Sequence, residues 1–140
     1  MKILNAYVIP GIPKVKKESL DAVYSKYCDL VIDRYIRINH IGDNNKARLI
    51  LLTQKLISSK KRIAGLVYLR YMFMYYLKHE RDYYSLVSIG NVLGGRHHTT
   101  VMSGVQEFRT MLDANYTPKD LTASEGAKKD YEELLILLQK

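Results

Sequence analysis

The chain has 140 residues, a length that favours one domain with a modest hydrophobic core. Hydrophobic residues make up 47% of it, which excludes an intrinsically disordered chain. No apolar run approaches the ~20 residues that a membrane span needs, so we expect no membrane protein. The N-terminal sequence MKILNAYVIP lacks a signal peptide's long apolar stretch. The single Cys28 excludes an internal disulfide, and we expect a cytoplasmic protein.

The charge is strongly basic and unevenly distributed. The formal net charge is +8, yet residues 113–140 hold four Lys and six Asp or Glu. Residues 1–112 therefore carry about +10, a balance that indicates a polyanionic partner. Nucleic acid is the first expectation, and a membrane surface is the second.

Residues 1–17 are predicted to form an extended arm, because Pro10, Gly11 and Pro13 break any helix. Two interpretations stay open for the arm. It is either a solvated terminus or, given its small lysine cluster, a segment that touches DNA backbone.

Three helices are predicted to follow, over residues 18–39, 46–58 and 63–80, because apolar residues recur at three- and four-residue steps. Cys28 is expected to be a small buried residue in the first helix. The tyrosines are expected mainly in the core, with base stacking as the alternative. The residues expected to face inward in the second and third helices are Leu49, Leu52, Leu56, Ile57, Leu66, Leu69, Phe73, Tyr76 and Leu77.

Residues 85–112 are predicted to form a helix-turn-helix. Ser85 is expected to cap the first helix, and Gly94 and Gly95 end it, because glycine adopts positive φ without steric cost. The second helix is expected to begin near Arg96, with five donor-capable side chains in its first turn. Such a helix start suits an anionic ligand. The expected core stripe of this helix is Val101, Val105, Phe108 and Leu112.

Residues 113–140 are predicted to form a connector and a last helix capped by Ser124. The helix is expected to pack on the domain through an apolar face; a dimer interface is the alternative. Its other side is expected to be acidic and to avoid DNA. The two faces are Ala127, Tyr131, Leu134, Leu135 and Leu138 against Glu125, Asp130, Glu132 and Glu133.

The motif I-G-x-x-L-G-G-R-H-H-T-T-V of residues 89–101 resembles the signature of the C-terminal DNA-binding domain of DnaA, the bacterial replication initiator. The resemblance is in strong register over residues 58–112. It implies a small all-α domain whose helix-turn-helix lies within residues 18–112, with the arm and the C-terminal helix as additions.

The resemblance also implies roles for individual residues. Arg62, at the end of a basic loop, matches a minor-groove arginine that senses A·T content. His98 and Thr99 match residues that contact base edges, while Arg96 and Thr100 match contacts to the DNA backbone. Further DNA contacts are expected from the rest of the basic loop, the following helix and the first helix of the motif: Lys60, Lys61, Arg70, Tyr71, Lys78 and Ser85.

His97 departs from the family, which usually has Asp at this position. An Asp can accept from the cytosine amino group, whereas a histidine can donate to purine N7 or guanine O6. We therefore expect a different preference, or weaker readout, at that base pair. Metal binding by His97 and His98 is not expected, because adjacent helical residues do not face one point and no cysteine pair accompanies them.

The sequence thus predicts a protein that binds double-stranded DNA with sequence preference, without cofactor, metal or enzymatic activity. No phosphate-binding Gly-x-x-x-x-Gly-Lys-Ser/Thr loop is present, so ATPase activity is not expected. The expected role is linked to replication or transcription, in the nucleoid of a bacterium or in a phage, with replication or mobile-element proteins as further partners. Two alternatives are a protein-interaction module with a degenerate helix-turn-helix, and the DNA-targeting subunit of a transposase or nuclease complex.

Overall fold

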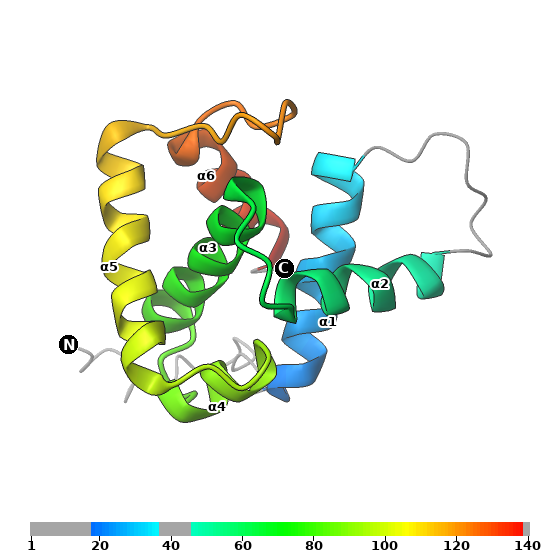
Figure 1. Cartoon of the computed structure of the whole chain (residues 1–140), viewed down its shortest axis with the longest axis vertical. Helices are drawn as coiled ribbons and strands as arrows, with labels where there is room; N and C mark the ends of the chain where they lie inside the picture. The colour runs from blue at the N-terminus through cyan, green and yellow to red at the C-terminus, as the bar shows by residue number, and fades with distance from the viewer. Residues whose placement is uncertain (1–17, 37–45, 139–140) are drawn as a thin grey trace, which may run out of the picture.

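The computed structural model describes residues 18–36 and 46–138, and this part of the chain is built from helices joined by turns, with no strand (Figure 1). The all-α fold class is therefore confirmed. The expected N-terminal arm lies outside the described residues. The helices are α1 (Leu20–Val31), a short π-helical continuation η2 (Ile32–Ile36), α2 (Lys46–Ser58), α3 (Ala64–Glu80), α4 (Leu86–Val92), α5 (His98–Ala114) and α6 (Ala127–Leu138).

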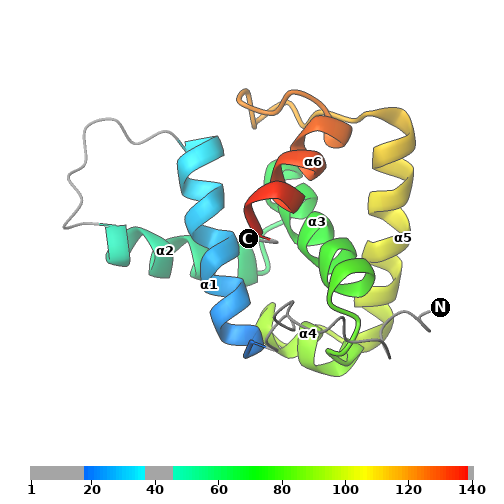
Figure 2. The ribbon, with the colours of Figure 1, turned by 180° about the vertical axis from the view of Figure 1, so that it is seen from behind.

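The core is organised around α3. Figures 1 and 2 show α3 between α5 on one side and α1 on the other. Because neighbours cover α3 on several sides, Leu69, Phe73, Tyr76 and Leu77 are buried as expected, and so is Tyr68. The aromatic rings pack together rather than facing solvent, as in the stacked pair Tyr27 and Phe73, whose centroids are 4.6 Å apart.

Helix α1 begins at a serine cap, because the Ser19 side chain accepts from the backbone N–H of Ala22. The prediction that Cys28 is a buried structural residue is confirmed. Burial raises the pKa of its thiol to about 12, so this side chain is not a nucleophile at neutral pH.

Helix α2 has the predicted bounds, but its buried face is not the predicted one. Ile57 is fully buried, whereas Leu52 and Leu56 are 45% and 42% exposed, so the prediction that both face inward is wrong. Leu49 is half-buried. The buried polar residue on α2 is Thr53, one turn before Ile57. Figures 1 and 2 show why: α2 crosses α1 and extends away from the body, so only a narrow stripe is covered.

Helix α6 packs back on the domain, against α1 and α5, through Ala127, Tyr131, Leu134 and Leu138, as expected. Two predictions about this segment need correction. The helix begins at Ala127, three residues beyond Ser124. Asp130 is not on an outer acidic face: it is buried, and it accepts from the hydroxyls of Tyr68 and Ser124, both at 2.5 Å. The carboxylate therefore fastens α6 and its preceding turn to α3.

Within residues 18–36 and 46–138, no helix combines the length and hydropathy that crossing a lipid bilayer would require.

Candidate nucleic-acid interface

The turn between α4 and α5 explains the glycines of the motif. Its backbone closes on itself through the N–H of Arg96, which donates to the carbonyl of Gly90 at 2.8 Å. A Cβ atom on Gly90 would overlap the Arg96 carbonyl. Gly94 and Gly95 have φ of +92° and +78°, in the left-handed region that favours glycine. The Gly-x-x-x-Gly-Gly pattern is thus required by close backbone approach and by backbone conformation.

Each helix of the motif has a side-chain cap. Ser85 caps α4 as predicted, accepting from the N–H of Ser88 at 3.0 Å. The start of α5 needs correction, because Arg96 and His97 precede the helix, whose first residue is His98. His97 is the N-cap: its Nδ1 accepts from the N–H of Thr99 at 3.2 Å.

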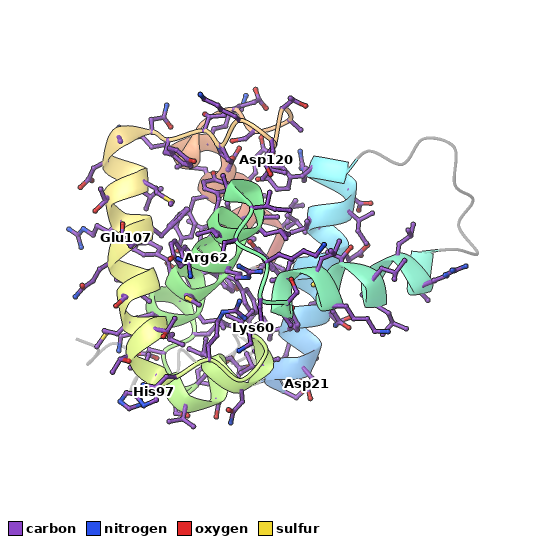
Figure 3. All side chains as sticks on the ribbon, in the orientation of Figure 1. Asp21, Lys60, Arg62, His97, Glu107 and Asp120 are labelled. Carbon is purple, nitrogen blue, oxygen red and sulfur yellow. The ribbon has the colours of Figure 1, made fainter. Side chains whose placement is uncertain are left out.

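The start of α5 is exposed. His97, His98, Thr99 and Thr100 are all open to solvent, whereas Val101 is fully buried. The rings of His97 and His98 lie 4.2 Å apart at their centroids and form a small platform. Figure 3 shows His97 at the lower end of α5, at the edge of the molecule. Of the predicted core stripe, Val101, Val105 and Phe108 are buried and Leu112 is half-buried, and this packing holds the exposed end in place.

A second exposed segment, the basic loop Lys60–Arg62, lies between α2 and α3. All three side chains are solvent-exposed. Figure 3 shows Lys60 and Arg62 on the viewed side of the molecule, in front of α3. The loop leaves α2 at Ser59, whose Oγ accepts from the N–H of Lys61 at 3.3 Å.

Two arginines join the basic loop to the turn. The carbonyl of Ser59 accepts from Arg96 Nη2 at 2.6 Å and from Arg70 Nη2 at 2.9 Å. Arg70 Nε also donates to the Ile57 carbonyl at 2.5 Å. Burial lowers the pKa of both guanidinium groups, and for Arg70 the nearby charge of Arg96 lowers it further. The carbonyls at the end of α2 provide the compensating negative charge.

These contacts change the interpretation of both arginines. Arg70 is only 4% exposed, so in this conformation it is not open to a DNA phosphate and the expected backbone contact needs correction. Arg96 is half-buried, with its guanidinium on the carbonyls of Ser58, Ser59 and Leu93. Sequence spacing could not reveal that Arg70 faces inward, because α3 is buried on most of its faces and not on a single stripe.

Three further residues were expected to contact DNA. Tyr71 is half-buried and packs beside Gly104, where a Cβ atom would overlap Met74 and crowd the Tyr71 ring. Lys78 and Ser85 are exposed near the connection between α3 and α4. Among residues 18–36 and 46–138, no group of His, Cys, Asp and Glu could hold a metal ion.

The sequence reasoning missed the residues that fix the end of α2. Ser58 Oγ lies 2.7 Å from the Tyr24 hydroxyl and donates to the Val92 carbonyl at 3.2 Å. The Tyr24 oxygen also lies 2.9 Å from the Gln54 carbonyl, which is a second acceptor for its single hydroxyl hydrogen. The pair Ser58-Ser59 directly before a basic run was the available signal, whereas nothing in the spacing of Tyr24 indicates its partner.

The short helix α4, the glycine turn and the exposed start of the longer helix α5 lie beside the basic loop. Comparison with known proteins finds a match in this region. Residues 47–107 match the family described as bacterial dnaA protein helix-turn-helix. The DnaA resemblance of the sequence is thereby confirmed for this segment, which is similar to the DnaA helix-turn-helix.

The similar curated proteins carry one name. "Chromosomal replication initiator protein DnaA" of Herpetosiphon aurantiacus is 41% identical over 64 residues, which are 46% of this chain and 13% of that protein. The protein of the same name from Oenococcus oeni is 38% identical over 60 residues, 43% of this chain and 13% of its own length. The match thus spans about an eighth of these DnaA relatives. No solved structure matches the chain significantly.

Proposed function

We propose that this chain binds double-stranded DNA with sequence preference, placing the first turn of α5 in the major groove and the loop Lys60–Arg62 in the minor groove. The observation that carries the proposal is the exposure of both segments together with their attachment to one point, the carbonyl of Ser59. A groove-reading surface needs exposed polar groups held on a rigid support.

The expected contacts divide by role. His97, His98 and Thr99 contact base edges, and Arg62 senses minor-groove width. Lys60, Lys61, Lys78, Ser85 and Thr100 contact the sugar-phosphate backbone and supply salt-dependent affinity, with Tyr71 at the edge of this surface. Arg96 contributes by shaping the turn and by its positive charge. The proposed function is DNA binding only, and we assign no residue of this chain to nucleotide hydrolysis or other catalysis.

The cellular role is proposed from the relatives. Because they are named as replication initiators, we propose that this chain recognises a related DNA site in the context of replication, or uses such a site to regulate transcription. Replication or mobile-element proteins are the expected protein partners.

The test begins with selection of bound sequences from a random duplex pool, followed by fluorescence anisotropy over a range of salt concentrations. We expect an enriched site with an A·T-rich part, and a steep salt dependence. His98→Ala should weaken binding to the selected duplex at least tenfold, as expected for loss of a base-edge contact.

Lys119→Ala is the matched control for loss of a basic side chain. Lys119 is exposed and precedes Asp120, which Figure 3 shows at the opposite end of the molecule from His97. Its loss should change affinity by no more than about twofold. A pool that shows no enrichment and no salt-sensitive complex would refute the proposal.

One observation favours a second function, that of a protein-interaction module. Leu51, Leu52 and Leu56 of α2 are 58%, 45% and 42% exposed, which is unusual for neighbouring leucines. Absence of any DNA complex, with retention of a folded monomer, would favour this alternative. A nuclease or transposase partner would instead appear as a subunit that co-purifies with a DNA-binding chain.

A further inference from the structure

The corner at the end of α2, residues 56–59, is where the two proposed reading segments meet. The last carbonyls of a helix have no partner within it and attract cations. Here two arginines supply the hydrogen bonds. Arg70 reaches this corner from α3, and Arg96 reaches it from the turn before α5.

The corner also contacts the α4–α5 turn directly. Ser58 Oγ donates to the Val92 carbonyl at 3.2 Å, and the Ser58 carbonyl fills the space beside Gly94. On the other side, the Tyr24 hydroxyl holds Ser58 to α1. Three separate segments therefore fix one short stretch of backbone.

The basic loop begins at this stretch. Only Lys60 and Lys61 separate the clamped Ser59 from Arg62, the proposed minor-groove residue. A shift of the Ser59 carbonyl would therefore move the exposed loop relative to the start of α5. Arg70 is buried, with 4% of its surface exposed, and it donates hydrogen bonds to the carbonyls of Ile57 and Ser59.

We propose that Arg70 is a positioning residue for DNA recognition, which locks the Ser59 corner so that the minor-groove loop and the α5 start bind as one rigid unit. The inference rests on the proposed function and deepens it. Arg70 does not touch DNA; it acts through the backbone of Ser59 and hence through Arg62. DNA recognition in the two grooves is coupled through this corner, because Arg96 of the α4–α5 turn donates to the same Ser59 carbonyl.

The test compares Arg70→Lys with the wild type on the selected duplex and on a scrambled one. Lysine keeps the charge but cannot reproduce the planar fork that reaches Ile57 and Ser59. We expect at least a tenfold loss on the selected duplex, a relaxed A·T preference like that of Arg62→Ala, and little change on scrambled DNA. The slope of log K against log salt should stay unchanged, because no phosphate contact is lost.

A double-mutant cycle with Arg62→Ala tests the route of action. If Arg70 acts through the loop, Arg70→Lys should cost much less affinity once Arg62 is absent. Additive losses would overturn the inference, as would a salt slope lower by about 0.9, which marks a lost phosphate contact.

Arg81→Lys is the matched control. Arg81 is also buried, at 5% exposure, but it bonds the Tyr76 hydroxyl and the Leu138 carbonyl instead of the corner. The substitution Arg81→Lys should lower the melting temperature of the protein without changing its preference for A·T-rich DNA. If Arg70→Lys lowers only the melting temperature in the same way, Arg70 is not a positioning residue.

Arg96→Lys serves as a second variant if Arg70→Lys does not fold, because it removes the other fork from the Ser59 carbonyl. It should relax A·T preference in the minor groove as well. An unchanged A·T preference would overturn the coupling. The two proposals fail differently: a wild type without a specific DNA complex refutes the proposed function, whereas a binding wild type with an unaffected preference in these variants refutes only the inference.

Discussion

The carbonyl oxygen of Ser58 occupies the space that a Cβ atom on Gly94 would need. Gly94 also has φ of +92°, so two independent constraints require glycine there. Its neighbour Gly95 has φ of +78°, but a Cβ atom on Gly95 would meet no other group within 4 Å, so this residue carries only the conformational constraint. The two glycines of the turn therefore have different sensitivities to the same substitution.

Gly94→Ala is expected to destabilise the fold clearly more than Gly95→Ala. For Gly95→Ala, the left-handed backbone conformation alone should cost about 1–2 kcal/mol. Gly94→Ala adds the overlap with Ser58, which forces the basic corner away from the turn, so we expect a loss above about 2 kcal/mol and weaker DNA binding. Urea unfolding of both variants gives the comparison. Equal losses of unfolding free energy in the two variants would show that the backbone of Ser58 moves away from the new methyl group at no energetic cost.

The helices themselves were largely predictable from the sequence. The bounds of α2, the cap Ser85 and the buried stripe Val101, Val105 and Phe108 agree with the structure, because local spacing and capping chemistry determine them. The exposure of Leu52 and Leu56 was not predictable, since periodicity identifies an apolar face but not whether a neighbour covers it.

The candidate site was predictable as a set of exposed residues but not as a network. The signature located His97 to Thr100 and the basic loop correctly on the surface. It could not reveal that Arg70 turns inward, because an arginine on a central helix has the same spacing whether it faces DNA or the end of another helix. Contacts such as Tyr24 to Ser58 join segments far apart in the chain and leave no local pattern.

His97→Asp is expected to change base preference without harming the fold. In the structure His97 Nδ1 accepts from the N–H of Thr99, so the neutral ring carries its proton on Nε2 and presents a donor outward. Aspartate caps a helix equally well but presents only acceptors. Preference at the contacted base pair should therefore move toward one that offers the cytosine amino group.

Anisotropy titrations with the four duplexes that differ at this base pair measure the shift. The unfolding free energy of His97→Asp should stay within about 0.5 kcal/mol of the wild type, since the cap is kept. If both proteins rank the four duplexes alike, His97 does not read a base.

Asp130→Ala is expected to destabilise the protein by about 2–3 kcal/mol, because it leaves the buried hydroxyls of Tyr68 and Ser124 without their acceptor. Glu132→Ala is the control, since Glu132 is exposed on the same helix. Urea unfolding at neutral pH separates the two. At a temperature where Asp130→Ala is folded, its affinity for DNA should equal that of the wild type, because α6 lies outside the proposed interface.

Glu18 is expected to give the fold a stability contribution that is lost in acid. Its carboxylate pairs with Lys26 and, at 3.1 Å, with Arg81, whose side chain is 6% exposed. The hydrogen bond from Lys26, with the charges of both cations, holds the pKa of Glu18 below its ordinary range, although desolvation opposes this. A lowered folded-state pKa stabilises the protein above the ordinary glutamate pKa, about 4.3, and the contribution disappears as the pH falls through the lowered value.

Glu18→Gln should therefore be less stable than the wild type by up to about 1 kcal/mol at pH 7, as expected for a partly exposed ion pair. The difference should shrink when unfolding is measured near pH 3, below the ordinary glutamate pKa, because protonation removes the charge that the Glu18→Gln variant lacks at every pH. Adding salt at pH 7 should shrink it too, since the Lys26 partner is half-exposed and screened. A difference that is the same at both pH values would mean that the Glu18 side chain stabilises the protein by something other than its charge, because glutamine keeps the backbone carbonyl that accepts from the Tyr84 hydroxyl.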